Sequence, residues 1–129
     1  MNKKKILIVE DDKLNQLAYK GLLSKIYDIV ICGDDYEFDK ALTQDTYDLF
    51  IVDLALNCDK DGIDLIKELR LMNIYKDSPI IVVTAFAMRK DRENSLAAGA
   101  NSFMTKPFDK DNLIAEIEQC LLDCSNKTE

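Results

Sequence analysis

Lys5-Ile6-Leu7-Ile8-Val9 is a short apolar run that leads directly into three acids, Glu10-Asp11-Asp12. The run does not alternate between apolar and polar residues, which is typical of a parallel strand buried on both faces. Similar short strands are predicted at 28–32, 49–52, 79–83 and 102–104. The segments that connect these five strands decide whether the strands pair in parallel.

Segments with the period of a helix separate the predicted strands. The first predicts an apolar stripe that consists of Leu14, Leu17, Ala18, Gly21 and Leu22. The second is opened by Asp34 and Glu37, which resemble a capping box, and buries Phe38, Ala41 and Leu42. The others begin near Gly62, near Met88 with a stop at Gly99, and near Asp109 as an N-cap.

This alternation predicts an α/β fold with five strand–helix units in one doubly wound domain over residues 1–129. Short strands joined by helices pair in parallel through right-handed crossovers, and the helices then cover both faces of the sheet. Ligands of such sheets bind beyond the carboxyl ends of the strands. The residues at those ends are therefore the candidates for function.

Length and composition narrow the class of protein. A chain of 129 residues fits one domain with one core. No apolar run approaches the roughly 20 residues that span a bilayer, and the run after the lysines at positions 3 to 5 is too short for a signal peptide. We therefore expect a cytoplasmic protein without membrane contact. The net charge of −7 argues against nucleic-acid binding.

The chain contains no histidine. This excludes serine–histidine and cysteine–histidine nucleophile pairs, histidine metal clusters and a phosphohistidine on this chain. Any phosphohistidine in its function must belong to a partner. The four cysteines form no Cys-x-x-Cys pair, and we expect them to be reduced thiols.

Charged and polar residues follow the ends of four predicted strands. The first strand ends in Glu10 and Asp11, the third in Asp53 and the fourth in Thr84, and Lys106 follows the fifth. If these strands are neighbours, the side chains converge. Two carboxylates about 4 Å apart repel by roughly 4 kcal/mol at an effective dielectric of about 20. A hard dication such as Mg²⁺, together with a lysine, would offset that repulsion.

Such a pocket suits Mg²⁺ plus an anion, and the natural anion is a phosphoryl group. An aspartate carboxylate can act as the nucleophile that forms an aspartyl-phosphate. These transfers depend on positioning and on neutralising the equatorial oxygens. The metal, Thr84 and Lys106 supply one partner for each oxygen, and Asp53 is the predicted acceptor.

In the order and spacing of these residues, the chain resembles the receiver domains of bacterial response regulators in two-component phosphorelays. The resemblance covers residues 5 to about 122 and rests on five motifs: Ile-Leu-Ile-Val-Glu10-Asp11, Asp53, Asp61-Gly62, Thr84-Ala85 and Lys106-Pro107-Phe108. It implies the flavodoxin-like strand order 2-1-3-4-5. It also implies a sensor histidine kinase or a histidine phosphotransfer protein as donor, an unknown downstream protein, and allows a phosphorylation-linked homodimer.

The resemblance implies a role for each residue that binds the metal or the phosphoryl group. Asp53 resembles the phosphoacceptor and a metal ligand. Asp11 resembles the direct ligand of Mg²⁺, and Glu10 the acid that holds the metal largely through water. The backbone carbonyl of Ala55 would be a further ligand, and Lys106 resembles the phosphate-binding lysine.

A second set of roles concerns the conformational switch. Thr84 resembles the switch hydroxyl and Phe103 the switch aromatic, and the bond between Lys106 and Pro107 is expected to be cis. On phosphorylation, Thr84 would move toward the phosphoryl group and let Phe103 turn inward. That would repack the surface of the fourth helix, fifth strand and fifth helix.

The loop after Asp53 departs from the family pattern. Residues 54–61 lack the proline that family members commonly have there, and the loop looks one residue longer. The positions two after Asp53 and two after Thr84 are Ala55 and Phe86. In the family these positions tune hydrolysis, and neither apolar side chain can orient a water. A fairly long-lived phosphoryl group is therefore expected.

Other interpretations stay open. The chain could be a degenerate receiver that binds proteins independently of phosphorylation. It could also be a phosphohydrolase with an aspartyl nucleophile, although a second acid would normally stand where Ala55 is. A flavin site would need a phosphate loop rich in Ser, Thr or Gly after the first strand. Each site residue alone has a structural explanation, as for Asp12 as a helix cap, but the ordered set favours the phosphoacceptor.

Overall fold

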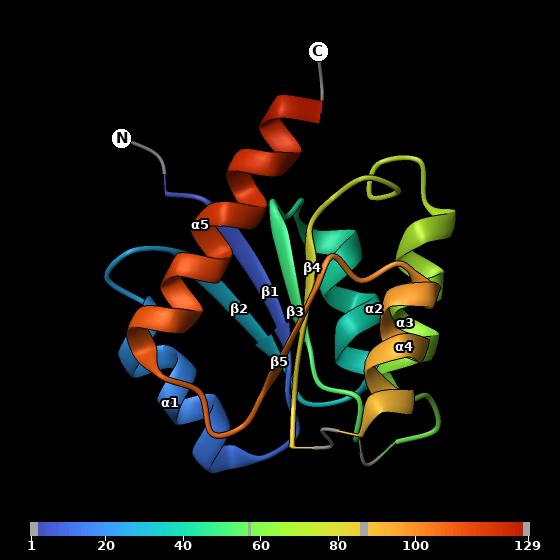
Figure 1. The fold of residues 1–129 in the computed structure, drawn as a ribbon, viewed down its shortest axis with the longest axis horizontal. Helices are drawn as coiled ribbons and strands as arrows, with labels where there is room; N and C mark the ends of the chain where they lie inside the picture. Colours follow the sequence, from blue (N-terminus) through green and yellow to red (C-terminus); the bar gives the residue numbers. More distant parts are fainter. Residues whose placement is uncertain (1–2, 57, 86–87, 128–129) are drawn as a thin grey trace.

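Five strands and five helices alternate along the part of the chain that the computed structural model describes, residues 3–56, 58–85 and 88–127 (Figure 1). In chain order they are β1 (Lys5–Val9), α1 (Lys13–Leu23), β2 (Asp28–Cys32), α2 (Asp35–Gln44), β3 (Leu49–Val52), α3 (Gly62–Leu71), β4 (Ile80–Thr84), α4 (Arg89–Ala98), β5 (Ser102–Thr105) and α5 (Lys110–Lys127). Each predicted strand is present within one residue of its predicted ends at most. Among the helices described, none is long and apolar enough to cross a membrane.

The strands form one parallel sheet in the order β2-β1-β3-β4-β5. In register, Leu7 of β1 pairs with Val30 of β2 on one side and with Phe50 of β3 on the other. The predicted fold class and strand order are confirmed. The chain reverses its direction of growth at β1, so the carboxyl ends of β1 and β3 meet at the topological switch point where such sheets bind ligands.

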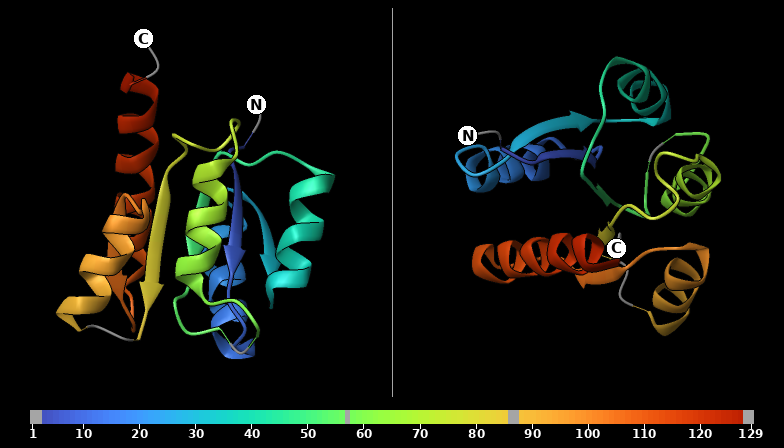
Figure 2. Two further views of the ribbon diagram at one scale, coloured as in Figure 1. Left: turned by 90° about the vertical axis from the view of Figure 1, so that its right-hand side faces the viewer. Right: turned by 90° about the horizontal axis from the view of Figure 1, so that it is seen from above.

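The sheet lies between two layers of helices (Figure 2), and the side chains of its central strands alternate between the two cores. In β1, Ile6 and Ile8 belong to the core under α1 and α5, whereas Leu7 and Val9 belong to the core under α2 and α3. All four are at most 1% exposed. Burying one such side chain is worth about 1.5–3 kcal/mol, which explains why the strands read as continuous apolar runs.

The apolar stripe predicted for α1 is wrong. Leu14 and Leu17 are 76% and 62% exposed, and the helix instead buries Tyr19 and Leu23. Residues 14 and 17 lie on a different side of the helix from 19 and 23, because each residue turns the helix by about 100°. Tyrosine has an apolar ring, and in this chain its burial against the sheet decides which face of α1 points inward.

Aspartate side chains cap the starts of α1, α2 and α3. At α2, Asp34 accepts a hydrogen bond from the N–H of Glu37 at 2.8 Å, as predicted. The returning bond differs from a capping box, because Glu37 Oε1 accepts from the N–H of Gly33 at 2.6 Å. A full capping box occurs at α3, between Asp61 and Asp64. This box holds the start of α3 next to the loop that follows β3.

Candidate functional site

The ends of β1 and β3 place Glu10 and Asp53 next to one another. The sheet ladder continues one residue past each strand, because the N–H of Glu10 donates to Cys32 O at 2.9 Å and the N–H of Asp53 donates to Val9 O at 3.1 Å. The two residues are 1% and 5% exposed. The backbone therefore fixes two carboxylates in a buried position, as the sequence predicted for this edge of the sheet.

Lys106 joins these two carboxylates. Its Nζ lies 2.6 Å from Glu10 Oε1 and 2.6 Å from Asp53 Oδ2. Its backbone N–H donates to the carbonyl of Thr84 at 2.9 Å, which holds the residue beside the end of β4. The bond from Lys106 to Pro107 is cis, which confirms that expectation. Lys106 thus forms one ion cluster with two buried carboxylates that lie 96 and 53 positions before it in the chain.

The second oxygen of each carboxylate is bound by backbone. Glu10 Oε2 accepts from the N–H of Asp12 at 3.1 Å, and Asp53 Oδ1 accepts from the N–H of Ala55 at 3.0 Å. The side chain of Gln16 donates to the carbonyl of Glu10 at 2.6 Å. Sequence reasoning did not identify Gln16; its position one turn into the first helix, four residues after the cap, was the available signal.

The pKa values in this cluster follow from burial and from charge. Burial raises the pKa of the Glu10 carboxyl; Asp53 adds to this effect, while Lys106 opposes it. Burial would lower the pKa of Lys106, but hydrogen bonds and charge attraction from Asp53 and Glu10 outweigh it, so that its pKa is raised. Lys106 is therefore an ammonium at neutral pH, as the arrangement requires.

Gly62 lets α3 approach the backbone of the strand end. A Cβ atom at this position would lie 2.2 Å from Asp53 O and 2.8 Å from Leu54 Cα. The N–H of Gly62 donates to Leu54 O at 3.2 Å. Only glycine fits this close approach, which explains the Asp61-Gly62 motif in physical terms.

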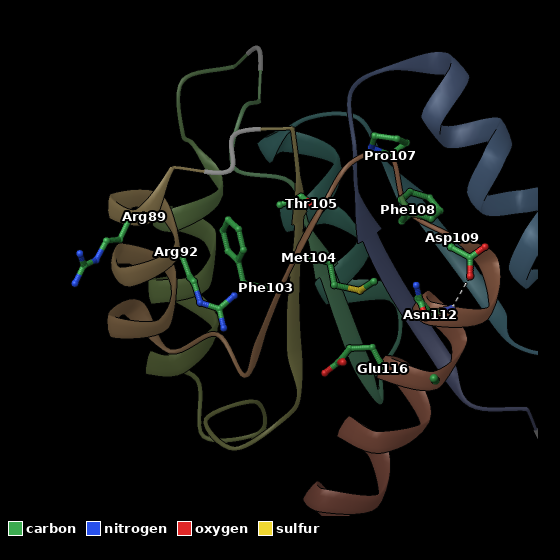
Figure 3. A pocket seen from close by; sticks show the side chains of 11 residues that line it. Arg89, Arg92, Phe103, Met104, Thr105, Pro107, Phe108, Asp109, Asn112 and Glu116 are labelled. Carbon is green, nitrogen blue, oxygen red and sulfur yellow. Dashed lines mark hydrogen bonds between the residues drawn. The ribbon is translucent and has the colours of Figure 1, made fainter.

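Thr84 and Phe103 lie at the β4–β5 side of the pocket. Thr84 is fully buried at the end of β4, and Phe103 is half-buried on β5. The ring of Phe103 points toward α4, where the guanidinium carbon of Arg92 lies 5.9 Å from the ring centroid (Figure 3). Phe103 lines an open groove of about 650 Å³ between α4, β5 and α5.

The remaining predicted ligands lie at the same strand ends. Asp11 is half-buried next to Glu10, and Ala55 is exposed two residues after Asp53. Within the described ranges, no three acidic or cysteine side chains are arranged to hold a metal ion as they stand; Lys106 lies between two of the acids. Carboxylate and carbonyl oxygens are nevertheless the donors that Mg²⁺ prefers. Phe86, expected to affect hydrolysis, lies outside the described residues.

The strand order and the buried acidic pocket define a doubly wound α/β domain with two carboxylates and a lysine at its switch point. Residues 6–118 match the family model of the response regulator receiver domain. The chain belongs to this family, whose members are signalling domains of two-component systems. Receiver domains interact with histidine kinases or phosphotransfer proteins.

Curated relatives are longer than this chain. The transcriptional regulatory protein CpxR of Klebsiella pneumoniae is 36% identical over 117 residues, which cover 91% of this chain and 49% of CpxR. The transcriptional regulatory protein KdpE of Staphylococcus aureus is 37% identical over 114 residues, which cover 88% of this chain and 48% of KdpE. The chain therefore spans about half the length of these relatives.

Solved structures share the whole fold. A CheY-like receiver domain protein from Methanospirillum hungatei has a TM-score of 0.88 at 25% identity, covering 98% of this chain and 99% of that one. The receiver domain of the sensor histidine kinase PA1611 from Pseudomonas aeruginosa has a TM-score of 0.83 at 30% identity, covering 92% and 98%. The PA1611 structure contains a magnesium ion coordinated in its active site cleft.

Proposed function

We propose that this chain accepts a phosphoryl group on Asp53 in the presence of Mg²⁺ and transmits that state through the surface of α4, β5 and α5. The observation that carries the proposal is the buried ammonium of Lys106, 2.6 Å from both Asp53 and Glu10. An acceptor carboxylate and a cation for the incoming anion are thereby held in one pocket. This is the positioning that phosphoryl transfer depends on.

The reaction forms one bond and breaks one. An oxygen of the Asp53 carboxylate forms the new O–P bond while the P–N bond of a donor phosphohistidine breaks. The imidazole nitrogen keeps the electron pair of that bond and takes up a proton. Because this chain has no histidine, the donor is a partner, either a sensor histidine kinase or a histidine phosphotransfer protein.

The oxygens at the strand ends are suited to hold Mg²⁺. Glu10, Asp11, Asp53 and the carbonyl of Ala55 would bind it, and the magnesium in the cleft of the PA1611 receiver supports this assignment. When bound, the ion supplies positive charge that offsets the acids and the phosphoryl oxygens. Lys106 would then give up a carboxylate contact and pair with a phosphoryl oxygen.

The switch would operate through Thr84 and Phe103. The Thr84 hydroxyl donates to another phosphoryl oxygen, and its displacement gives Phe103 room to turn away from Arg92 toward β4. This replaces one packing of the groove between α4 and α5 by another, which a downstream protein or a second copy of the chain can recognise. In the present arrangement the guanidinium of Arg92 lies over the ring of Phe103. This contact would be lost when the ring turns inward, which supports a repacking at this place.

The first test is the intact mass of the protein after incubation with a small acyl phosphate and Mg²⁺. One added phosphoryl group is expected in the wild type and in Asp59→Asn, because Asp59 is an exposed acid of the same loop. No adduct is expected in Asp53→Asn or with EDTA. An adduct that persists in Asp53→Asn would refute the acceptor assignment. No adduct in the wild type, with no Mg²⁺ binding, would favour the degenerate receiver.

The adduct should also persist. Ala55 carries no group that could orient a water, and Phe86 is apolar as well. Slow hydrolysis is therefore expected, and Phe86→Glu should shorten the half-life of the phosphorylated form measured by mass. An unchanged half-life in that variant would contradict the role given to this position.

A further inference from the structure

Tyr19 connects α1 to the segment that carries Lys106. Its ring stacks on the ring of Phe108, with centroids 5.1 Å apart and an interplanar angle of 21°. Tyr19 is 1% exposed, and Phe108 packs against the same core cluster. Phe108 follows Lys106 by two residues, on the segment between β5 and α5 (Figure 3). Aromatic stacking of this kind stabilises a contact beyond the burial of area alone.

Tyr19 also lies within electrostatic reach of the acidic pocket. Burial raises the pKa of its hydroxyl well above the ordinary value, and the carboxylates of Glu10 and Asp53 raise this pKa further. Tyr19 thus stacks on Phe108, and its pKa responds to the same two carboxylates that bind Lys106.

The segment after Lys106 has few other attachments. On its upstream side, Lys106 is tied to β4 by the hydrogen bond from its N–H to Thr84 O. On its downstream side, the next backbone hydrogen bond is from Leu113 N to Asp109 O, in the first turn of α5. Among the hydrogen bonds of the described residues, none holds Phe108. Together with the packing of Phe108 against the core cluster, the ring stack thus fixes the chain just after the lysine.

We propose that Tyr19 is a positioning residue that holds Lys106 between Glu10 and Asp53 through its stack on Phe108. A lysine has four rotatable bonds in its side chain, so the place of its ammonium depends on where its backbone is held. Loss of the stack lets the segment shift and moves the ammonium away from one or both carboxylates. The catalytic consequence rests on the proposed function, whereas the position of Lys106 does not.

Three variants separate the stack from general packing. Tyr19→Phe keeps the ring and removes the hydroxyl, and Tyr19→Leu removes the aromatic face. Tyr27→Leu is the matched control, because Tyr27 is also a buried tyrosine of the same core cluster, 6% exposed. Among the ring contacts of the described residues, Tyr27 does not pair with Phe108.

The direct readout is the NMR signal of the Lys106 ammonium in protein labelled with ¹⁵N-lysine. A buried ammonium that donates to two carboxylates exchanges its protons slowly, and its signal is assigned by its loss in Lys106→Met. We expect the protected signal in the wild type, Tyr19→Phe and Tyr27→Leu, and its loss in Tyr19→Leu. Retention of the signal in Tyr19→Leu, or equal loss in Tyr27→Leu, would overturn the proposal.

The second readout is the rate of phosphorylation by a small acyl phosphate. A displacement of about 1 Å can cost up to about a hundredfold in rate, so Tyr19→Leu should be at least about tenfold slower. Tyr19→Phe and Tyr27→Leu should stay within about twofold of the wild type. If the wild type is never phosphorylated, the proposed function fails, while the ammonium signal still decides the position of Lys106.

Phe108 offers the same test from the other side of the stack. Phe108→Leu should reproduce the loss seen in Tyr19→Leu, and it remains informative if Tyr19→Leu fails to fold, because Phe108 is only half-buried. The double variant should be no worse than either single one, since residues that act through one contact are not additive. Additive losses would show that the two rings act separately and would refute the proposal.

Discussion

The ion cluster around Lys106 depends on all three of its members. Glu10 and Asp53 are almost completely buried, and each has one oxygen 2.6 Å from the ammonium. Removing one partner of a buried ion pair leaves a charge without compensation and typically costs about 3–5 kcal/mol. At the scale of single residues, chemistry and stability are therefore linked in this pocket. Gly62, which lies against the backbone of Asp53, also links the chemistry of the pocket to the stability of the fold.

Gly62→Ala should destabilise the protein and weaken the site. The added methyl group would lie 2.2 Å from Asp53 O, and backbone cannot move aside as a flexible side chain can. We expect the free energy of unfolding to fall by about 1–3 kcal/mol, as for other overpacked positions, and phosphorylation of Asp53 to slow. Urea denaturation measures the first effect and intact mass the second.

Gly21→Ala is the control for this substitution. Gly21 lies on the exposed side of α1, and a Cβ there meets nothing within 4 Å. Alanine stabilises a helix interior by about 0.8–1.0 kcal/mol relative to glycine, so this variant should be more stable than the wild type. If both variants lost stability equally, the close approach of α3 to Asp53 would not be the cause.

Cys120 should give the folded protein a pH dependence in the alkaline range. Burial, with the nearby Glu116, raises the pKa of its thiol from 9.0 to about 11. Between these values the native state keeps a proton that the unfolded chain loses, so stability falls as the pH rises. The contribution is complete below pH 9 and declines through pH 11. By about pH 10 the loss is on the order of 1 kcal/mol.

Urea denaturation of the wild type and Cys120→Ala, from about pH 8 to about pH 10, tests this effect. The cavity that alanine leaves costs the same at each pH, whereas the thiol contributes only in the wild type. The difference in unfolding free energy between the two proteins should therefore shrink by an amount on the order of 1 kcal/mol. A constant difference would mean that the thiol titrates as it does in the unfolded chain.

The residues at the strand ends were predictable, whereas the contacts that support them were not. Glu10, Asp53 and Lys106 each follow a strand of a parallel sheet, and the strand order that the resemblance implies predicts their meeting. Tyr19 acts through a contact with Phe108, far along the chain, and no local pattern indicates that contact. Roles such as metal ligation by Asp11 stay predictions, because they concern bound states.

At the scale of elements, Arg70 joins the end of α3 to two loops. Its guanidinium makes five hydrogen bonds, of 2.7 to 3.1 Å, to the carbonyls of Gly99, Tyr75 and Lys76 and to Asn101 Oδ1. Asn101 Oδ1 also accepts from the N–H of Ile80 at 2.8 Å, where β4 begins. One side chain on α3 therefore sets the starts of β4 and β5, at the edge opposite the acidic pocket.

Arg70→Met should lower the free energy of unfolding by about 2–3 kcal/mol, because hydrogen bonds to charged groups are worth about 1.5–3 kcal/mol and some carbonyls lose their partner. Arg70→Lys should recover only part of this loss, since an ammonium cannot reproduce the planar fork of a guanidinium. Arg89→Met is the control, with an arginine side chain that is 91% exposed. A loss below about 0.5 kcal/mol in Arg70→Met, as usual for surface substitutions, would contradict the role given to Arg70.

The existence of each element followed from the sequence more reliably than its orientation. The central strands β1, β3 and β4 matched because continuous apolar runs are buried on both sides and leave no choice of face. On α1 there was a choice of face, because Leu14 and Leu17 lie on a different side of the helix from Tyr19. Both of these leucines proved to be exposed. Which side faces inward depends on packing against β1 and β3, and the sequence pattern does not contain that information.

At the scale of the whole molecule, the two helical layers leave the carboxyl edge of the sheet as the place for a ligand. Hydrophobic clusters cover both faces of the sheet, whereas the described residues at that edge bring two buried carboxylates together with one ammonium. The net charge of the chain, −7, adds a general attraction for cations to this local one. Cation binding at the pocket should therefore be measurable as a change in the stability of the entire fold.

Mg²⁺ should raise the free energy of unfolding of the wild type, because a ligand that binds only the native state stabilises it by mass action. At ten times the dissociation constant the gain is about 1.4 kcal/mol, and it grows with the logarithm of the concentration. Thermal or urea denaturation across a Mg²⁺ series measures this gain, and EDTA should remove it. The increment should be reduced in Asp53→Asn and unchanged in Asp59→Asn, whose acid lies outside the pocket. An equal increment in both variants would mean that Mg²⁺ acts on the overall negative charge, and the assignment of the metal to the ends of β1 and β3 would have to be abandoned.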